Sequence, residues 1–318
     1  MKSILATIKP YLGWVILGVT LFFLAKAFKD SWREIAAVRV DLAAWMFLSA
    51  ALIVTLLAHV WSGWVWKWIL SAFKISIGRW LGIKIYLTTN IAKYLPGNVW
   101  HFSGRIIAVS QHESSIEAAT LSVLLEPLLM AAAALSIGLI SMSLGWLETN
   151  FEPKIIGLQF FCLAVILTGI HPHILNPLIA RLSRQKIKQG KIFCNFESKG
   201  IAQLNSYPLK PFLGEIGFVI FRGLGFLLTF MAFHQLTPLQ IPSLISTFCF
   251  AWLFGLILPG APGGIGVFEA TAIALLNHNL FPTPIVLTTV AYFRLISILA
   301  EAIAAGLAYL ACQRSSGV

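Results

Sequence analysis

The sequence contains little charge for its length. Only 11% of its 318 residues are charged, against roughly 25% in an ordinary soluble domain. No stretch is polar enough to cover the surface of a second, soluble domain. Because 58% of the residues are hydrophobic and the mean hydropathy is +0.85, the composition predicts one integral membrane domain over residues 1–318.

Cysteine motifs and catalytic motifs are missing as well. The four cysteines show no CxxC spacing, so the sequence indicates neither a disulfide framework nor a metal site. It has no nucleotide-binding loop, Ser/His/Asp order or paired catalytic carboxylates, so we expect neither a cofactor nor an enzyme. The 23 basic and 12 acidic residues fit anionic lipid and cytoplasmic loops better than a nucleic acid.

Six apolar runs are long enough to cross a bilayer core of about 30 Å, which takes about 20 residues. They lie near residues 8–28, 43–66, 116–145, 155–175, 211–235 and 284–312. Two further apolar regions, 80–112 and 242–280, are interrupted in the middle by proline and glycine. Neither region is expected to form one unbroken helix.

The distribution of basic residues predicts the topology. The segment 176–210 carries seven Lys or Arg against one Glu, so it is expected in the cytoplasm. If region 80–112 crossed the membrane, Lys67, Lys74 and Arg79 would lie outside, so the charges favour a re-entrant hairpin that returns to the same side. Region 242–280 is interpreted as a second re-entrant hairpin, entering from the outside, and both termini are then cytoplasmic.

Each half of the chain then contains three spans and one hairpin, in residues 1–145 and 155–312. Because three is an odd number, the two halves are inverted relative to each other, as in many secondary transporters. The predicted fold is an all-α integral membrane protein with about six full spans, two re-entrant helical hairpins and an inverted 3+3 repeat. We expect it in the inner (plasma) membrane.

The two breaks are the first candidate binding elements. Non-helical backbone at membrane depth is tolerated only where protein buries it or where it lines a cavity, and an amide-rich helix end can hold a phosphate. Two kinks that only help helices to pack are the alternative. The candidate residues at the breaks are Pro96, Gly97, Asn98, Trp100 and His101 in the first, and Pro259, Gly260, Gly263, Gly264 and Gly266 in the second.

Ionisable residues inside apolar segments are the second signal, because a charge at the bilayer centre costs about 3 kcal/mol or more unless it is paired or solvated. The candidates are Arg105, Glu126, Arg222, Glu269, Arg294 and Glu301. Arg105 and Glu269 follow the two breaks at nearly equivalent distances, so they could face each other or flank one substrate. Structural ion pairs that close the helix bundle are an equally good interpretation for any single residue.

The two break motifs resemble a known family. The segments Lys93-Tyr94-Leu95-Pro96-Gly97-Asn98-Val99-Trp100-His101-Phe102-Ser103-Gly104-Arg105 and Leu258-Pro259-Gly260, followed by Gly263-Gly264-Ile265-Gly266-Val267-Phe268-Glu269, are similar to the transmembrane region of the lysylphosphatidylglycerol synthase/flippase family. The resemblance spans essentially the whole chain. It implies a polytopic membrane protein of bacteria or archaea whose best-known relatives move aminoacylated phosphatidylglycerol between leaflets, while others accompany polyprenyl-linked sugar pathways.

Two features depart from that family pattern. Glu126 resembles an acidic position of the family, but Pro127 follows it where a basic residue is expected. Bifunctional relatives continue into a soluble domain that transfers the aminoacyl group from tRNA, and this sequence has no such domain. We therefore expect lysyl transfer only if a separate transferase performs it.

The sequence predicts a protein that binds and flips an anionic phospholipid or a polyprenyl-linked head group. Arg105, Gly97 and Asn98 would hold the phosphate, and Glu269 a cationic or hydroxylated part. The remaining ionisable candidates would line or brace the path. A secondary transporter of a small anion is one alternative, and a non-transporting membrane partner of a lipid-glycosylation enzyme is another.

Overall fold

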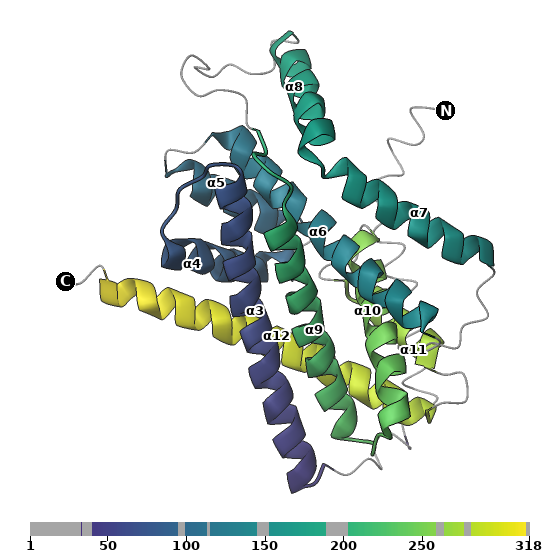
Figure 1. Ribbon diagram of the computed structural model, residues 1–318. Coiled ribbons are helices and arrows are strands. Elements are labelled where there is room, and N and C mark those ends of the chain that lie inside the picture. The colour runs from purple at the N-terminus through teal and green to yellow at the C-terminus, as the bar shows by residue number, and fades with distance from the viewer. Residues whose placement is uncertain are drawn as a thin grey trace, which may run out of the picture.

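The protein is described by a computed structural model that covers Arg33 and residues 40–94, 99–112, 115–144, 153–188, 203–258, 264–276 and 281–315. All regular structure in these residues is helical (Figure 1), which confirms the predicted all-α class. The following predictions lie outside the described residues: the span at 8–28, and the candidate site residues Pro96, Gly97, Asn98, Pro259, Gly260 and Gly263.

Five described helices are long and apolar enough to cross a membrane. Four of them coincide with predicted spans and extend at most a few residues beyond them: α3 (Leu42–Ala72), α6 (Ile116–Ser143), α9 (Leu209–Met231) and α12 (Thr283–Ser315). The fifth is formed by η2 (Pro238–Gln240) together with α10 (Ile241–Ile257). The chain is therefore a multi-pass membrane protein.

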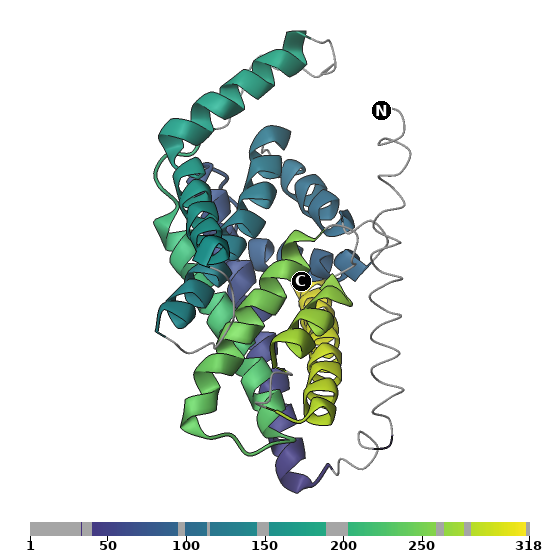
Figure 2. The same ribbon diagram turned by 90° about the vertical axis from the view of Figure 1, so that its right-hand side faces the viewer.

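Helices α3 and α9 lie side by side over much of their length, and α12 crosses them (Figures 1 and 2). Small residues allow the close approach of α3 and α9. A Cβ atom on Gly214 would lie 2.6 Å from Val65 Cγ2, and the Gly214 carbonyl accepts a 2.8 Å hydrogen bond from Trp61 Nε1. Small residues at helix contacts are typical of membrane proteins, where close packing drives helix association.

The predicted span at 155–175 differs in the structure, which divides this region into two helices. Helix α7 (Pro153–Gly169) and helix α8 (Pro172–Lys188) meet at a bend of 70°. Pro172 explains the break, because proline is accepted in the first turn of a helix and disfavours helix in the residue before it. Helix α8 extends away from the main bundle (Figure 1) and continues into the segment that was expected to be a basic loop.

Each of the two interrupted regions contains two helices, one on either side of the break. The first consists of α4 (Arg79–Asn90) with η1 (Ile91–Tyr94), and α5 (Trp100–Ser110). The second consists of α10 and α11 (Val267–Leu276). In both regions the two arms pack against each other. Since η2 and α10 together are long enough to span the membrane, the re-entrant hairpins and the inverted repeat stay predictions.

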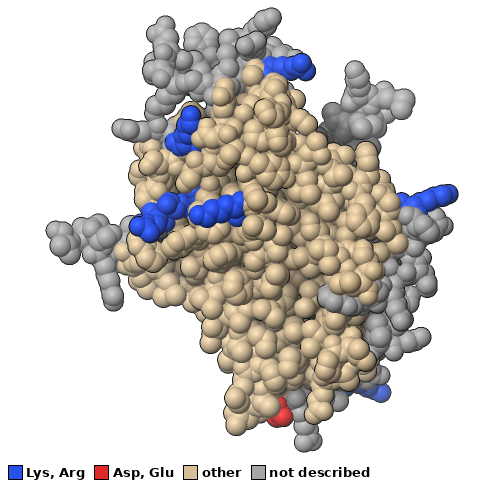
Figure 3. All heavy atoms as spheres, in the orientation of Figure 1, with Lys and Arg blue, Asp and Glu red and all other residues tan. Residues whose placement is uncertain are grey.

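Basic residues gather at one end of the bundle, where α3 ends and α9 begins (Figure 3). The Asn205 amide donates to the Ala72 carbonyl across this end, and Lys74, Arg79 and Lys210 are exposed there. The exposed Asp41 caps the other end of α3. By the positive-inside rule, the basic end is the one expected to face the cytoplasm.

Candidate anion-binding cavity

A cavity of about 320 Å³ lies among helices α3, α4, α5, α6, α9, α10, α11 and α12 and the short helix η1. Seven of the predicted site residues line it: His101, Arg105, Glu126, Arg222, Gly264, Arg294 and Glu301. Glu269 is buried directly behind Arg294, whereas Trp100 is 55% exposed at the start of α5. The structure thus brings charged residues from both halves of the sequence to one place.

Arg105 is paired with Glu126 through its Nη1 atom. His101, Arg105 and Val109 form the buried face of α5, because residues four apart lie on the same side of a helix. Arg105 Nη2 also donates to Asn90 Oδ1 at 3.3 Å, and the guanidinium lies 3.9 Å from the centre of the Tyr86 ring. The charge of Arg105 is therefore already balanced by a carboxylate.

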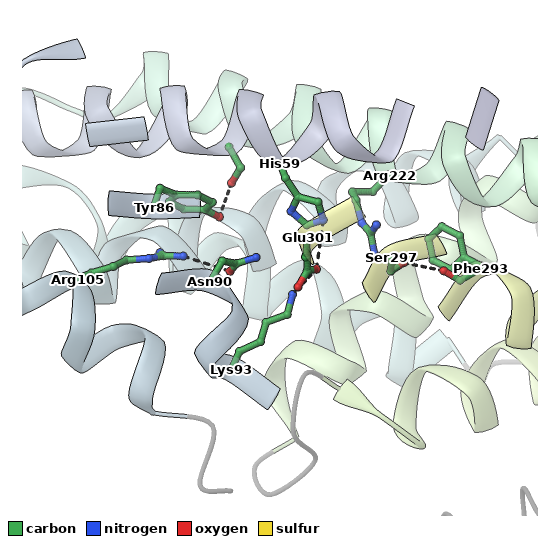
Figure 4. A network of polar contacts seen from close by, with 10 residues as sticks. His59, Tyr86, Asn90, Lys93, Arg105, Arg222, Phe293, Ser297 and Glu301 are labelled. Carbon is green, nitrogen blue, oxygen red and sulfur yellow. Dashed lines mark hydrogen bonds and ion pairs between the residues drawn. The ribbon is translucent and has the colours of Figure 1, made fainter. Parts of the chain in front are cut away.

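Glu301 receives two basic groups, as Figure 4 shows. Lys93 Nζ donates to Glu301 Oε1 at 2.6 Å, and His59 Nε2 lies 3.2 Å from the same oxygen. Lys93 comes from η1, directly before the first break, and His59 comes from the middle of α3. We call Glu301, Lys93 and His59 the Glu301 cluster, which joins η1, α3 and α12 around one carboxylate.

Glu269 fixes the start of α11 to α12. Its Oε1 accepts from Arg294 Nε at 2.6 Å, and its Oε2 accepts from the Gly266 amide at 2.5 Å. Arg294 Nη2 donates to the Gly264 carbonyl at 3.2 Å. Gly264 has a φ of +72°, a conformation that glycine adopts far more readily than other residues. Arg105 and Glu269 therefore do not pair with each other, and each has a partner of its own.

Arg222 differs from the other cavity cations, because no carboxylate of the described residues forms an ion pair with it. It is 7% exposed. Its Nη2 donates to Ser297 Oγ at 3.1 Å, and its guanidinium lies 4.9 Å from the centre of the Phe293 ring. Its Nη1 is buried and has no hydrogen-bond partner. An arginine with an open donor beside a cavity is suited to bind an anion.

The family comparison agrees with this architecture. A model of the family described as "Lysylphosphatidylglycerol synthase TM region" matches residues 11–305. The chain belongs to this family. The matched segment contains both break motifs and every residue that lines the cavity, and it corresponds to the membrane region of the family rather than to its catalytic domain. No match was found among curated proteins.

Sequence reasoning missed three ionisable residues inside this lysylphosphatidylglycerol synthase membrane region, two of them buried and one partly buried. Lys93 and His59 line the cavity, and Glu215 is fully buried on α9. Lys93 stands in the first break motif, while His59 and Glu215 stand within the apolar runs 43–66 and 211–235. A complete list of ionisable residues in the predicted spans would have identified His59 and Glu215.

Proposed function

We propose that this protein binds and translocates an anionic phospholipid or a lipid-linked anionic head group across the inner membrane. Membership of the family indicates a role related to membrane lipid. The cavity adds the chemistry, since its wall combines buried cations with aromatic and aliphatic side chains such as Phe218 and Trp252. Such a surface suits a ligand with a charged head and an apolar body.

The observation that carries the proposal is the open guanidinium of Arg222. Burial of an unpaired charge is costly, so a sequence that keeps one beside a cavity is expected to use it. A phosphate oxygen that accepts from Arg222 Nη1 would complete the donor set of the guanidinium and supply the direct anionic contact that Glu301, which acts on Arg222 only through space, does not provide. Arg222 therefore replaces Arg105 as the proposed phosphate anchor, because Arg105 already has Glu126.

The other predicted residues receive supporting roles in this proposal. Lys93 and Arg294 add positive charge to the wall of the cavity, although each also contacts a carboxylate. The Glu301 cluster and the Glu269–Arg294 pair hold η1 and α11 against α12, so they position the two arms that border the breaks. The basic end of the bundle is proposed to face the cytoplasm, with both termini on that side.

A flipping assay in proteoliposomes tests the proposal with three labelled lipids: phosphatidylglycerol, its lysyl form and a polyprenyl phosphate. We expect the wild type to move at least one of them between leaflets. The Arg222→Gln variant should reduce this movement by about 10-fold or more, since a charge-assisted hydrogen bond contributes roughly 1.5–3 kcal/mol. Lys210→Gln on the same helix is the matched control, because Lys210 is exposed far from the cavity.

Two other outcomes would contradict this proposal, and each would indicate a different function. If folded protein moves none of the three lipids but releases trapped inorganic phosphate in an Arg222-dependent manner, the protein is a transporter of small anions. If the protein moves neither the lipids nor phosphate, and it co-purifies stably with a transferase, it is a non-transporting membrane partner of that enzyme.

A further inference from the structure

Glu215 is the most unusual buried group outside the ion pairs described above. It is 0% exposed in the second turn of α9, and neither of its carboxyl oxygens has a hydrogen-bond partner. An ionised carboxylate in such a place would lose its hydration without compensation, which costs far more than holding a proton. The environment therefore favours the neutral carboxylic acid.

The surroundings of Glu215 contain a second carboxyl and only one arginine. The charges of Glu126 on α6 and Arg105 on α5 act on Glu215, and Glu215 acts in turn on Tyr86 of α4. Glu126 stands on α6, which packs against α9, whereas Arg105 and Tyr86 stand on α5 and α4, which pack against α6 and α3. Arg105 is bound to Glu126, and no cation of the described residues forms an ion pair with Glu215, so only the neutral form of Glu215 avoids a buried negative charge without a partner.

Arg105 also has an unused donor. Its Nη1 and Nη2 are occupied by Glu126 and Asn90, but its buried Nε has no partner. The site therefore holds one open donor on the arginine and two open acceptors on Glu215. These groups permit a second arrangement in which Arg105 pairs with Glu215, and Glu126 carries the proton.

We propose that Arg105, Glu126 and Glu215 form a proton-binding site that holds one exchangeable proton between two carboxyls, of which Glu126 lines the cavity and Glu215 is buried on α9. We call these three residues the Arg105 cluster. In one state Glu215 is a carboxylic acid and Glu126 is the carboxylate that pairs with Arg105. In the other state the proton has moved to Glu126, and Arg105 pairs with the Glu215 carboxylate. The number of protons and charges is the same in both states.

This site provides a connection between protons and the anion. Glu126 and Arg105 line the same cavity as Arg222, so a phosphate anchored by Arg222 that also attracts Arg105 away from Glu126 would leave two carboxyls without a cation. Glu126 would then bind a second proton from solution. Binding of an anion in the cavity would thus be accompanied by proton uptake, a consequence that rests on the proposed function, whereas the proton site itself does not.

Infrared difference spectroscopy of the purified full chain in detergent tests the proton site without any lipid. We expect the wild type at neutral pH to show the carbonyl stretch of a buried protonated carboxylic acid, with a small shift in heavy water. Glu215→Gln should remove this band, whereas Glu269→Gln should retain it, because Glu269 is the carboxylate partner of Arg294. Absence of the band in the wild type, or its persistence in Glu215→Gln, would overturn the proposal.

A second variant separates proton sharing from a passive buried acid and does not require Glu215→Gln to fold. In Glu126→Gln, Arg105 has lost its carboxylate and becomes free to pair with Glu215. The carboxylic-acid band at neutral pH should therefore weaken severalfold. An unchanged band would show that Glu215 and Glu126 do not share Arg105, and would overturn the proposal.

Calorimetry tests the coupling to anion binding. Short-chain phosphatidylglycerol is titrated into the wild-type protein in two buffers of different ionisation enthalpy. A heat that differs between the buffers shows proton uptake, and this difference should disappear in Glu126→Gln. Binding with equal heats would overturn the coupling, and absence of binding would count against the proposed function; neither result would alter the infrared test of the proton site.

Discussion

The two charged clusters that border the cavity have opposite imbalances. In the Glu301 cluster, Lys93 and His59 converge on a single carboxylate. In the Arg105 cluster, a single guanidinium is paired with Glu126, and its charge also acts on a second carboxyl, that of Glu215. Lys93 and Arg222 are therefore two cations beside the one carboxylate of Glu301, whereas the Arg105 cluster is proposed to hold a proton. The difference suggests that one cavity handles an anion and a proton at separate places.

Replacement of Glu301 should produce the largest loss of stability. Glu301→Gln removes the carboxylate that binds Lys93 and His59, and it leaves the charge of the partly buried Lys93 without its partner. Breaking a buried pair in this way costs about 3–5 kcal/mol. Unfolding in mixed micelles, followed by tryptophan fluorescence, measures the change in the free energy of unfolding.

The double variant Lys93→Gln/Glu301→Gln serves as the control for this experiment. It removes both charges, so it should recover part of the lost stability. If the double variant were no more stable than Glu301→Gln, the unpaired lysine would not be the cause of the loss.

Replacement of Glu126 should cost less than replacement of Glu301, although both are paired carboxylates. In Glu126→Gln, the proposed sharing allows Arg105 to pair with a second carboxyl, that of Glu215. We expect a loss of about 1–3 kcal/mol in the free energy of unfolding. Adding Glu215→Gln removes this second carboxyl. The free energy of unfolding of the double variant should therefore fall by about 1 kcal/mol or more beyond the sum of the losses in the two single variants. Additive losses in the same unfolding assay would contradict this sharing.

Arg222→Met should change stability in the opposite direction. Arg222 is a buried cation without a carboxylate partner in the described residues, so a methionine of similar length removes an unpaired charge and keeps much of the packing. We expect the free energy of unfolding to rise by about 1 kcal/mol or more, while lipid movement in proteoliposomes is lost. A loss of both stability and movement would instead identify Arg222 as a structural residue.

The sequence predicted the helices well, because the apolar runs are long and their ends carry clear signals. The structure describes long helices at four of the predicted spans. The exception is 155–175, where Pro172 permits a bend of 70° that hydropathy alone does not reveal. The family resemblance was confirmed by a family model that matches residues 11–305, a segment that contains both break motifs.

The pairing of charges could not be predicted from the sequence. Arg105 binds Glu126 on α6, and Glu269 binds Arg294 on α12, so the partners come from different helices. Which residues meet depends on the rotation and crossing of these helices, and periodicity gives the buried face of each helix but not its neighbour. For the same reason the sequence placed the phosphate on Arg105 and did not distinguish Arg222.

Glu215→Gln should have the smallest effect on stability of the variants considered, although Glu215 is the most deeply buried carboxyl. Glutamine has nearly the shape of a protonated glutamic acid, and the exchange removes no charge if Glu215 is neutral. We expect a change of less than about 1 kcal/mol in the free energy of unfolding. A loss close to that of Glu301→Gln would mean that Glu215 is an ionised partner of Arg105. In that case the Arg105 cluster, like the Glu301 cluster, would consist of ionised groups and would hold no exchangeable proton.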